Sequence, residues 1–204
     1  MILVVDSGST STEWVFALKN KEITRHKGPG FNPYYYSGDD YLGNMKNHLQ
    51  GKINFEEVSD IFFYGSGCST VTNCDIVNAS LKTAFANANI QLQHDLFGAA
   101  VALFGKEKGI ACILGTGSNS CLWNGSEILE NVPSLGYLLA DEGSGTHIGS
   151  LILTDILLGE SPLDVAELFY SYYKIDFGGV LDYGEDKHQL IKLTLKIHKA
   201  IPLF

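Results

Sequence analysis

Two short turns rich in glycine, serine and threonine contain the residues best suited to chemistry. The first, Ser7-Gly8-Ser9-Thr10, follows an apolar run that ends in Asp6, and the second is Gly115-Thr116-Gly117-Ser118. Glycine lets backbone N–H groups converge on an anion because no Cβ intervenes, and the hydroxyl groups add further donors. Each turn alone is better explained as a structural hairpin. Two of them at matching places in the chain indicate a site that holds a triphosphate from both sides.

Three acidic residues stand beside turns, where a carboxylate can meet a ligand. Asp6, next to the first turn, suits Mg²⁺ held through water, or it caps the turn. Asp95 lies between an expected strand and an expected helix, so it is either an N-cap or an ionised base able to accept a proton from a substrate hydroxyl group. Asp141 precedes another helix in a Gly-rich segment, where a capping role shared with Ser144 is the alternative.

Other polar residues give weaker signals. Asn32, between Gly30 and Pro33, is typical of a turn. His94 and His147 are expected to be packing or surface residues, because no second ligand stands at metal-binding spacing. No GxxxxGK[ST] motif occurs, and neither turn matches GxGxxG before a helix, so neither a P-loop nor a Rossmann site is indicated.

The elements that must position these residues follow a repeated pattern. A buried strand, a Gly/Ser/Thr turn, a return strand, a tight turn and a third strand occur once from residue 2 and again from residue 109. The tight turns are Asn20-Lys21 and Asn124-Gly125. We expect strands at residues 2–6, 13–18, 22–26, 109–114, 119–123 and 126–130. The pattern indicates an internal duplication of architecture.

Helices and two further strands complete the expected α/β fold. Strands are expected at 60–64 and 90–94, and helices at 39–49 with Asp39 or Asp40 as cap, 74–87, 95–104, 146–158 and 162–173. The stretch 187–204 has apolar residues at helical spacing and four lysines. It is either a solvated helix face or a basic helix that binds a partner.

Composition and charge limit the function classes. The chain has 204 residues, 45% of them hydrophobic, which suffices for a packed core. Its net charge of −9 argues against binding nucleic acid or an anionic membrane, so phosphate must be held by backbone N–H groups or a metal. The N-terminus lacks the basic segment of a signal peptide, and the four cysteines form no CxxC pair. A cytoplasmic protein with reduced thiols is expected.

Several motifs together resemble a known superfamily. Asp6-Ser7-Gly8-Ser9-Thr10-Ser11-Thr12 resembles the first phosphate motif, DxGxTxT, of the sugar kinase, Hsp70 and actin superfamily, and Gly115-Thr116-Gly117-Ser118-Asn119-Ser120 resembles the second. Further segments resemble the N-acetylglucosamine kinase branch, which is related to the BadF/BadG/BcrA/BcrD ATPases: Gly30-Phe31-Asn32-Pro33, His94-Asp95, and the segment from Gly136 to Ser144. The match runs from residue 1 to about residue 170, and it departs where Ser11 replaces a common lysine.

The resemblance implies a fold and a domain organisation. The fold would be ribonuclease H-like, as in actin-like ATPases, with two duplicated α/β domains flanking a ligand cleft. The N-terminal domain would cover residues 1–105 and the second domain residues 106–204. Family chains are longer, and their later Gly-rich segment that packs on adenosine has no counterpart here. The resemblance therefore implies a second domain that is truncated at its C-terminus.

The resemblance also implies a role for each site residue. Asp95 would be the catalytic base, and Asp6 would position Mg²⁺ through water. ATP phosphates would be bound by Gly8, Ser9, Thr10, Thr12, Gly115, Thr116 and Gly117. The sugar would be bound by Asn32, Ser118, Asn119, Gly136, Tyr137 and Asp141, together with Asp95.

The implied activity is ATP-dependent phosphorylation of an amino sugar, with N-acetylglucosamine at its 6-hydroxyl group as the expected substrate. Two alternatives stay open: a non-catalytic sugar- or nucleotide-binding remnant that lacks the adenosine pocket, and an ATPase that activates a dehydratase through an iron–sulfur cluster held by cysteines. The expected small-molecule partners are the sugar and ATP with Mg²⁺. The resemblance also leaves a homodimer open, since family members are often dimers.

Overall fold

The computed structural model describes residues 1–18, 22–34, 36–133, 135–136, 138–174, 176, 178–180, 193–194 and 196–197. These residues form two compact units: Met1–Ala111 with Cys121–Glu130, and Cys112–Ser120 with Asn131–Phe204. Each unit is described by itself. The predicted turn at Asn20-Lys21, the sugar-site candidate Tyr137 and most of the predicted helix 187–204 lie outside the described residues.

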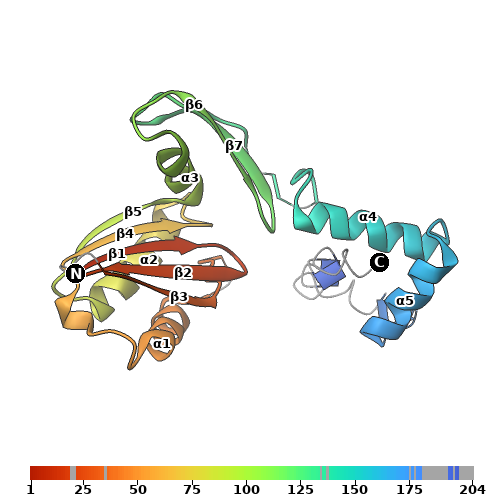
Figure 1. The fold of residues 1–204 in the computed structure, drawn as a ribbon, viewed down its shortest axis with the longest axis horizontal. Helices are drawn as coiled ribbons and strands as arrows, with labels where there is room; N and C mark the ends of the chain where they lie inside the picture. Colours follow the sequence, from red (N-terminus) through yellow and green to blue (C-terminus); the bar gives the residue numbers. More distant parts are fainter. Residues whose placement is uncertain are drawn as a thin grey trace. The chain divides into compact units, whose positions relative to one another are not determined.

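A five-stranded sheet forms the first unit. Its order is β3-β2-β1-β4-β5, with β2 and β3 antiparallel to their neighbours and β1, β4 and β5 parallel to one another. The strands are β1 (Ile2–Ser7), β2 (Ser11–Ala17), β3 (Ile23–Pro29), β4 (Asp60–Gly65) and β5 (Asn89–His94) (Figure 1). This order and these directions are those of the ribonuclease H-like fold, so the predicted fold class is confirmed.

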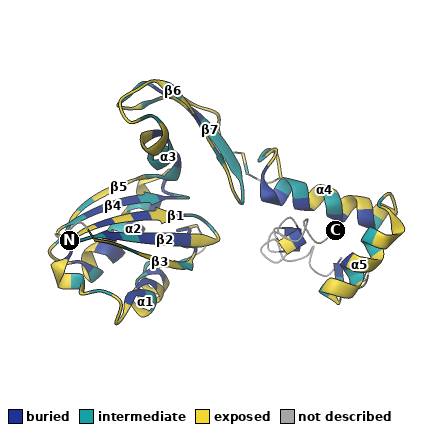
Figure 2. Ribbon diagram, in the orientation of Figure 1, coloured by how far each residue is buried: buried dark blue, intermediate teal, exposed yellow. Residues whose placement is uncertain are grey.

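Two helices pack on one face of this sheet, and a third lies on the other. Alternate residues of the central strands are buried against α1 (Gly38–Leu49) and α2 (Val71–Ala84) (Figure 2). This alternation arises because successive side chains of a strand point to opposite faces. The helix α3 (Asp95–Phe104) contacts β1, β4 and β5, and a Cβ at Gly98 would lie 2.6 Å from the Tyr64 ring. Tyr64 is on the opposite face from Ile61 and Phe63 of the same strand.

The structure corrects two predicted helix starts. The cap of α1 is Ser37, whose hydroxyl oxygen accepts a hydrogen bond from the Asp40 backbone N–H at 3.3 Å, and not Asp39 or Asp40. The helix α2 begins at Val71 because Thr70 caps it, and it ends at Ala84 instead of residue 87. In both cases a hydroxyl residue earlier in the chain satisfies the free N–H groups of the first turn.

A second sheet and two further helices follow along the chain. The sheet order is β6-β7-β8, with β6 at Gly109–Leu114, β7 at Ser118–Trp123 and β8 at Ile128–Asn131. The predicted turn at Asn124-Gly125 is present, with Gly125 at φ +103°. The helices are α4 (Gly145–Leu158), capped by Ser144, and α5 (Leu163–Tyr173). They contribute to a core made of Leu153, Ile156, Phe169, Val180, Leu193 and Ile197. Across the part of the chain described, no helix is both long and apolar enough to cross a bilayer.

Candidate active site

The ends of three parallel strands bring the first turn, Asp6 and Asp95 to one edge of the first unit's sheet. In the strand register Ser7 lies beside Gly65, and Gly65 lies beside His94. Because the three strands are parallel, the residues that follow them meet at the same edge, where α/β proteins bind their ligands. The sequence predicted the two acids separately, and the sheet brings them together.

Asp6 lies in a strongly negative environment. Partial burial raises the pKa of the Asp6 carboxyl group, and the nearby charges of Asp95 and then Glu13 raise it further. Glu13 is the direct neighbour of Asp6 on β2. Like charges this close favour a bound cation, because a cation between carboxylates offsets their mutual repulsion.

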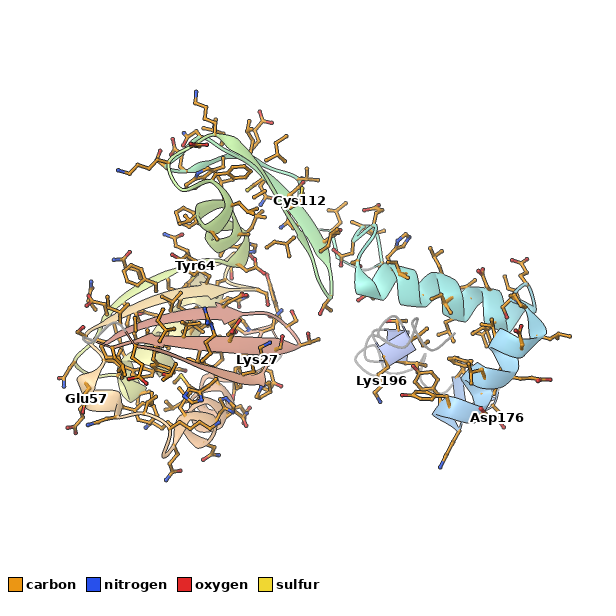
Figure 3. The ribbon with its side chains drawn as sticks, in the orientation of Figure 1. Lys27, Glu57, Tyr64, Cys112, Asp176 and Lys196 are labelled. Carbon is orange, nitrogen blue, oxygen red and sulfur yellow. The ribbon has the colours of Figure 1, made fainter. Side chains whose placement is uncertain are left out.

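The Asp95 carboxylate is held through one of its two oxygens. The Leu96 backbone N–H donates to Asp95 Oδ1 at 2.8 Å, and His94 Nδ1 lies 2.9 Å from the same oxygen. The Asp95 side chain is only 20% exposed. Figure 3 shows Tyr64 beneath α3, where it meets Gly98 of the helix that begins at Asp95. The two contacts at Oδ1 fix the orientation of the Asp95 carboxylate.

The first turn is tightened by its own backbone and by buried hydroxyl groups. The Gly8 N–H donates to the Ser11 carbonyl oxygen at 2.9 Å, and the Ser66 N–H donates to the Ser7 carbonyl oxygen at 2.8 Å. Ser7 Oγ lies 3.1 Å from Thr12 Oγ1, and both side chains are buried. Thr12 therefore stabilises the turn through its buried hydroxyl contact with Ser7. Its contact with ATP stays a prediction. Thr10 is exposed, and Gly8 and Ser9 are half-buried.

Asn32 links the first turn to the loop after β3. Its Nδ2 group donates to Ser9 Oγ at 3.0 Å, and its Oδ1 accepts from the Tyr34 N–H at 3.0 Å. Ser9 Oγ also lies 3.1 Å from Ser66 Oγ. An amide nitrogen carries two hydrogens, so Asn32 can bond Ser9 and still donate to a ligand.

The second turn is attached to the start of α4. The Gly145 N–H donates to the Gly115 carbonyl oxygen at 2.9 Å. The hydroxyl group and the N–H of Thr146 both donate to the Thr116 carbonyl oxygen, at 2.6 and 3.3 Å. The turn closes on itself through a bond from the Gly115 N–H to the Gly117 carbonyl oxygen at 2.9 Å. Helix α4 therefore fixes this turn mainly through its backbone.

Asp141 lies against the second turn. Its Oδ1 accepts from the Ser118 N–H at 3.2 Å, and a Cβ at Gly117 would lie 2.9 Å from its Oδ2. Asp141 has φ +70°, a left-handed conformation that is uncommon outside glycine and well tolerated by aspartate. The second unit thus joins the predicted phosphate turn to one predicted sugar residue. Gly136 has φ +75°, and Asn119 Oδ1 accepts from the Ser120 N–H.

Two residues of these networks were missed by the sequence predictions. Ser66 contacts the first turn, and Thr146 contacts the second. Both follow a glycine, in Gly65-Ser66-Gly67 after β4 and in Gly145-Thr146 at the start of α4. A hydroxyl residue next to glycine at the end of a parallel strand or the start of a helix was the available signal.

The donor set fits a magnesium ion with few protein ligands. No group of three or more His, Cys, Asp and Glu side chains suited to a metal occurs among the described residues. Mg²⁺ keeps several waters and commonly binds through one or two carboxylates and substrate phosphates, and Asp6 with Asp95 provides such a negative edge.

Two of the four cysteines are buried, which disfavours them as ligands of an iron–sulfur cluster. Burial raises the pKa of the Cys68 thiol to about 12, and Cys121 is also buried. Cluster ligands are thiolates, so a thiol held protonated by burial is a poor ligand.

Solved structures show what this chain resembles. The crystal structure named "Putative N-acetylglucosamine Kinase" from Porphyromonas gingivalis is 34% identical to it, with a TM-score of 0.86 over 100% of this chain and 71% of that one. A second structure with the same name, from Chromobacterium violaceum, is 18% identical, with a TM-score of 0.69 over 95% of this chain and 71% of that one. At 18% identity the likeness concerns the fold alone. The sequence matches no protein-family model and no curated protein.

Proposed function

This chain belongs to the N-acetylglucosamine kinase-like family, and we propose that it transfers the γ-phosphoryl group of ATP to the 6-hydroxyl group of N-acetylglucosamine or a similar amino sugar. The observation that supports this most directly is the shared sheet edge of the first unit. There Asp6, Asp95 and the first turn lie together at the ends of parallel strands. Such an arrangement suits a general base that lies beside a phosphate-binding turn, so that both act on a sugar and ATP bound together.

In the proposed reaction Asp95 is the base. Its Oδ2 accepts the proton of the sugar hydroxyl group as the hydroxyl oxygen bonds to the γ-phosphorus. The bond between the γ-phosphorus and the β–γ bridging oxygen then breaks, and ADP leaves. Catalysis of this kind consists largely of positioning and charge stabilisation. The two contacts on Asp95 Oδ1 support this role because they fix the plane of the carboxylate.

Both turns have a proposed part in binding ATP. The N–H groups and hydroxyl groups of Gly8, Ser9 and Thr10 would contact the phosphates in the first unit, as Gly115, Thr116 and Gly117 would in the second. Phosphate binding by backbone N–H groups suits a chain with a net charge of −9, because a basic patch is not expected in it. Bound Mg²⁺ would neutralise developing phosphate charge, and Asp6 would hold it through water.

A set of polar residues is proposed to bind the sugar. Asn32 in the first unit retains donor capacity beside the first turn. In the second unit Asp141 accepts a hydrogen bond from the N–H of Ser118, a residue of the second turn. Asn119, Gly136 and Tyr137 complete the proposed set. Hydrogen bonds from such polar groups would select a hydroxyl or acetamido pattern, because a buried group left unpaired is costly.

The assay is sugar-dependent ADP release by the full chain. We expect Asp95→Asn to lower kcat by about 100-fold or more, which is within the usual contribution of a general base. The matched control is Asp75→Asn, an exposed acid on α2 that should leave the rate unchanged. Full activity in Asp95→Asn would show that Asp95 is not the base.

Calorimetry separates the kinase from a non-catalytic binder. The chain spans 71% of the P. gingivalis protein. Titrations with N-acetylglucosamine and with ATP–Mg²⁺ should both give binding if the chain is a kinase. Sugar binding without nucleotide binding, together with no turnover, would favour the binder.

A further inference from the structure

We propose that Gly67 is a positioning residue for Asn32, whose amide group belongs to the proposed sugar site. Gly67 lies in the loop between β4 and α2. Because it has no Cβ, the Asn32 amide can lie against this loop and keep its Nδ2 group directed at the first turn. This inference rests on the proposed function for the identity of the ligand, but the contact between Gly67 and Asn32 can be tested without activity.

The orientation of the Asn32 amide is determined by its neighbours. The Tyr34 backbone N–H, which can only donate, lies 3.0 Å from Asn32 Oδ1. In a flipped amide, Nδ2 would face the Tyr34 N–H, and two donors would oppose each other. Oδ1 therefore faces Tyr34, and Nδ2 donates to Ser9 Oγ at 3.0 Å. Asn32 is only 8% exposed, so the amide is enclosed as well as bonded.

Gly67 borders the Asn32 amide on the side of its oxygen. A Cβ at Gly67 would overlap Asn32 Oδ1, and it would lie 3.0 Å from Asn32 Cγ and 3.1 Å from Pro33 Cδ. Gly67 also has φ +79°, a backbone conformation that favours glycine. An added methyl group would therefore displace the amide from its bonds to Tyr34 and Ser9.

The loop that contains Gly67 is held on both sides, so it does not move aside cheaply. The buried Asn73 side chain of α2 donates from Nδ2 to the Gly67 carbonyl oxygen at 2.8 Å. The Ser66 N–H donates to the Ser7 carbonyl oxygen at 2.8 Å. With the backbone bonded in this way, the end of the Asn32 side chain has to give way to a Cβ at Gly67. Small shifts of a positioning group are costly to a bound substrate.

The first experiment compares Gly67→Ala with Gly51→Ala by calorimetric titration. Gly51 has φ +74° and nothing within 4 Å of an added Cβ, so both variants have the same backbone strain and only Gly67→Ala meets Asn32. We expect Gly67→Ala to weaken N-acetylglucosamine binding by about 10-fold and ATP–Mg²⁺ binding by less than about 3-fold, and Gly51→Ala to change neither by more than about 2-fold. Thermal unfolding checks that both variants fold. Equal sugar affinities in the two folded variants would overturn the positioning role.

The same titration in an Asn32→Ala background shows whether Gly67 acts through Asn32. There the amide that Gly67→Ala displaces is absent, so the added substitution should change sugar affinity by less than about 2-fold. An undiminished loss of about 10-fold would show that Gly67 acts by another route, and the inference would be wrong.

A third measurement needs neither a ligand nor turnover. The side-chain amide NMR signals of Asn32, identified by their loss in Asn32→Ala, should shift in Gly67→Ala and stay in place in Gly51→Ala. If Gly67→Ala does not fold, Asn73→Leu, which removes the partner of the Gly67 carbonyl oxygen, should shift the same signals. Unshifted signals in the folded variant would contradict the inference whether or not the chain is a kinase. An unmodified chain that binds no sugar, with the shift present, would contradict the proposed function and leave the contact between Gly67 and Asn32 supported.

Discussion

The two Gly/Ser/Thr turns look alike in sequence and are held in different ways. Side chains from two other segments grip the first turn: Asn32 from the loop after β3 and Ser66 from the end of β4, both bonded to Ser9. In the second turn, the carbonyl oxygens of Gly115 and Thr116 accept hydrogen bonds from residues at the start of α4. The first turn is thus held largely by side chains of two other segments, and the second by the start of α4 together with the Asp141 carboxylate.

This difference predicts which substitutions should disturb each turn. The first turn depends on close packing of segments far apart in the sequence, so single substitutions outside it can deform it. The second turn rests mainly on backbone bonds that most side-chain changes leave in place, with the Asp141 carboxylate as a side-chain contact. Substitutions should therefore damage the first turn from a distance and the second mainly through its helix contact.

The largest loss of stability is expected from Gly30→Ala, which changes the loop that packs against the first turn. A Cβ at Gly30 would lie 2.5 Å from the Gly8 carbonyl oxygen and closer still to the backbone of Ser9 and Thr10. Because backbone atoms cannot move aside cheaply, we expect a loss of about 3 kcal/mol or more in unfolding free energy. Urea unfolding measures it.

Gly43→Ala is the control for that variant. Gly43 lies inside α1 with nothing within 4 Å of an added Cβ, so alanine there should stabilise the chain by about 0.5–1 kcal/mol. If Gly30→Ala unfolded at the same urea concentration as Gly43→Ala, the close packing beneath the first turn would be disproved.

An intermediate effect is expected from Thr146→Val at the start of α4, where Thr146 contacts the second turn. It removes the part-buried hydroxyl bond to the Thr116 carbonyl oxygen and keeps the backbone bond between the same residues. We expect a loss of about 1–2 kcal/mol in unfolding free energy. Ser66→Ala, which removes one half-buried hydroxyl bond to Ser9, should cost about 0.5–1 kcal/mol. A larger loss in Ser66→Ala would reverse the expected ranking of hydroxyl contacts at the two turns.

The smallest change in stability is expected from Asp6→Asn. Because burial and nearby carboxylates raise the Asp6 pKa on folding, the ionised group opposes folding at neutral pH. That penalty is complete above the folded-state pKa and absent below the unfolded value near 3.9. The variant should gain at most about 2 °C in Tm at pH 7, since Asp6 is partly exposed. The gain should vanish as the pH falls toward about 4.

Activity gives the second measurement on Asp6→Asn. ADP release should fall by about 10-fold or more if Asp6 holds Mg²⁺. Asp39→Asn, on the exposed first turn of α1, is the control and should leave the rate unchanged. A Tm gain in Asp6→Asn that persists at low pH would contradict the electrostatic explanation.

The sequence predicted the elements of the fold well where local signals were strong. The strand at 109–114 and the helix at 95–104 match the structure, and the glycine turns separate strands as expected. It failed at the starts of α1 and α2, where Ser37 and Thr70 act as caps. A cap depends on which nearby hydroxyl group reaches the free N–H groups, and several candidates stood within a few residues.

The functional residues divide in the same way. Residue type and spacing by themselves determined the two phosphate-type turns, Asp6 and Asp95 as candidates, because glycines, hydroxyls and acids at strand ends are local features. Only the tertiary structure decided that Asp6 and Asp95 share one edge, that Ser9 is gripped by Asn32 and Ser66, and that Asp141 lies on Gly117. Such contacts join segments tens of residues apart, and strand register and packing set them. Local sequence does not encode these distances.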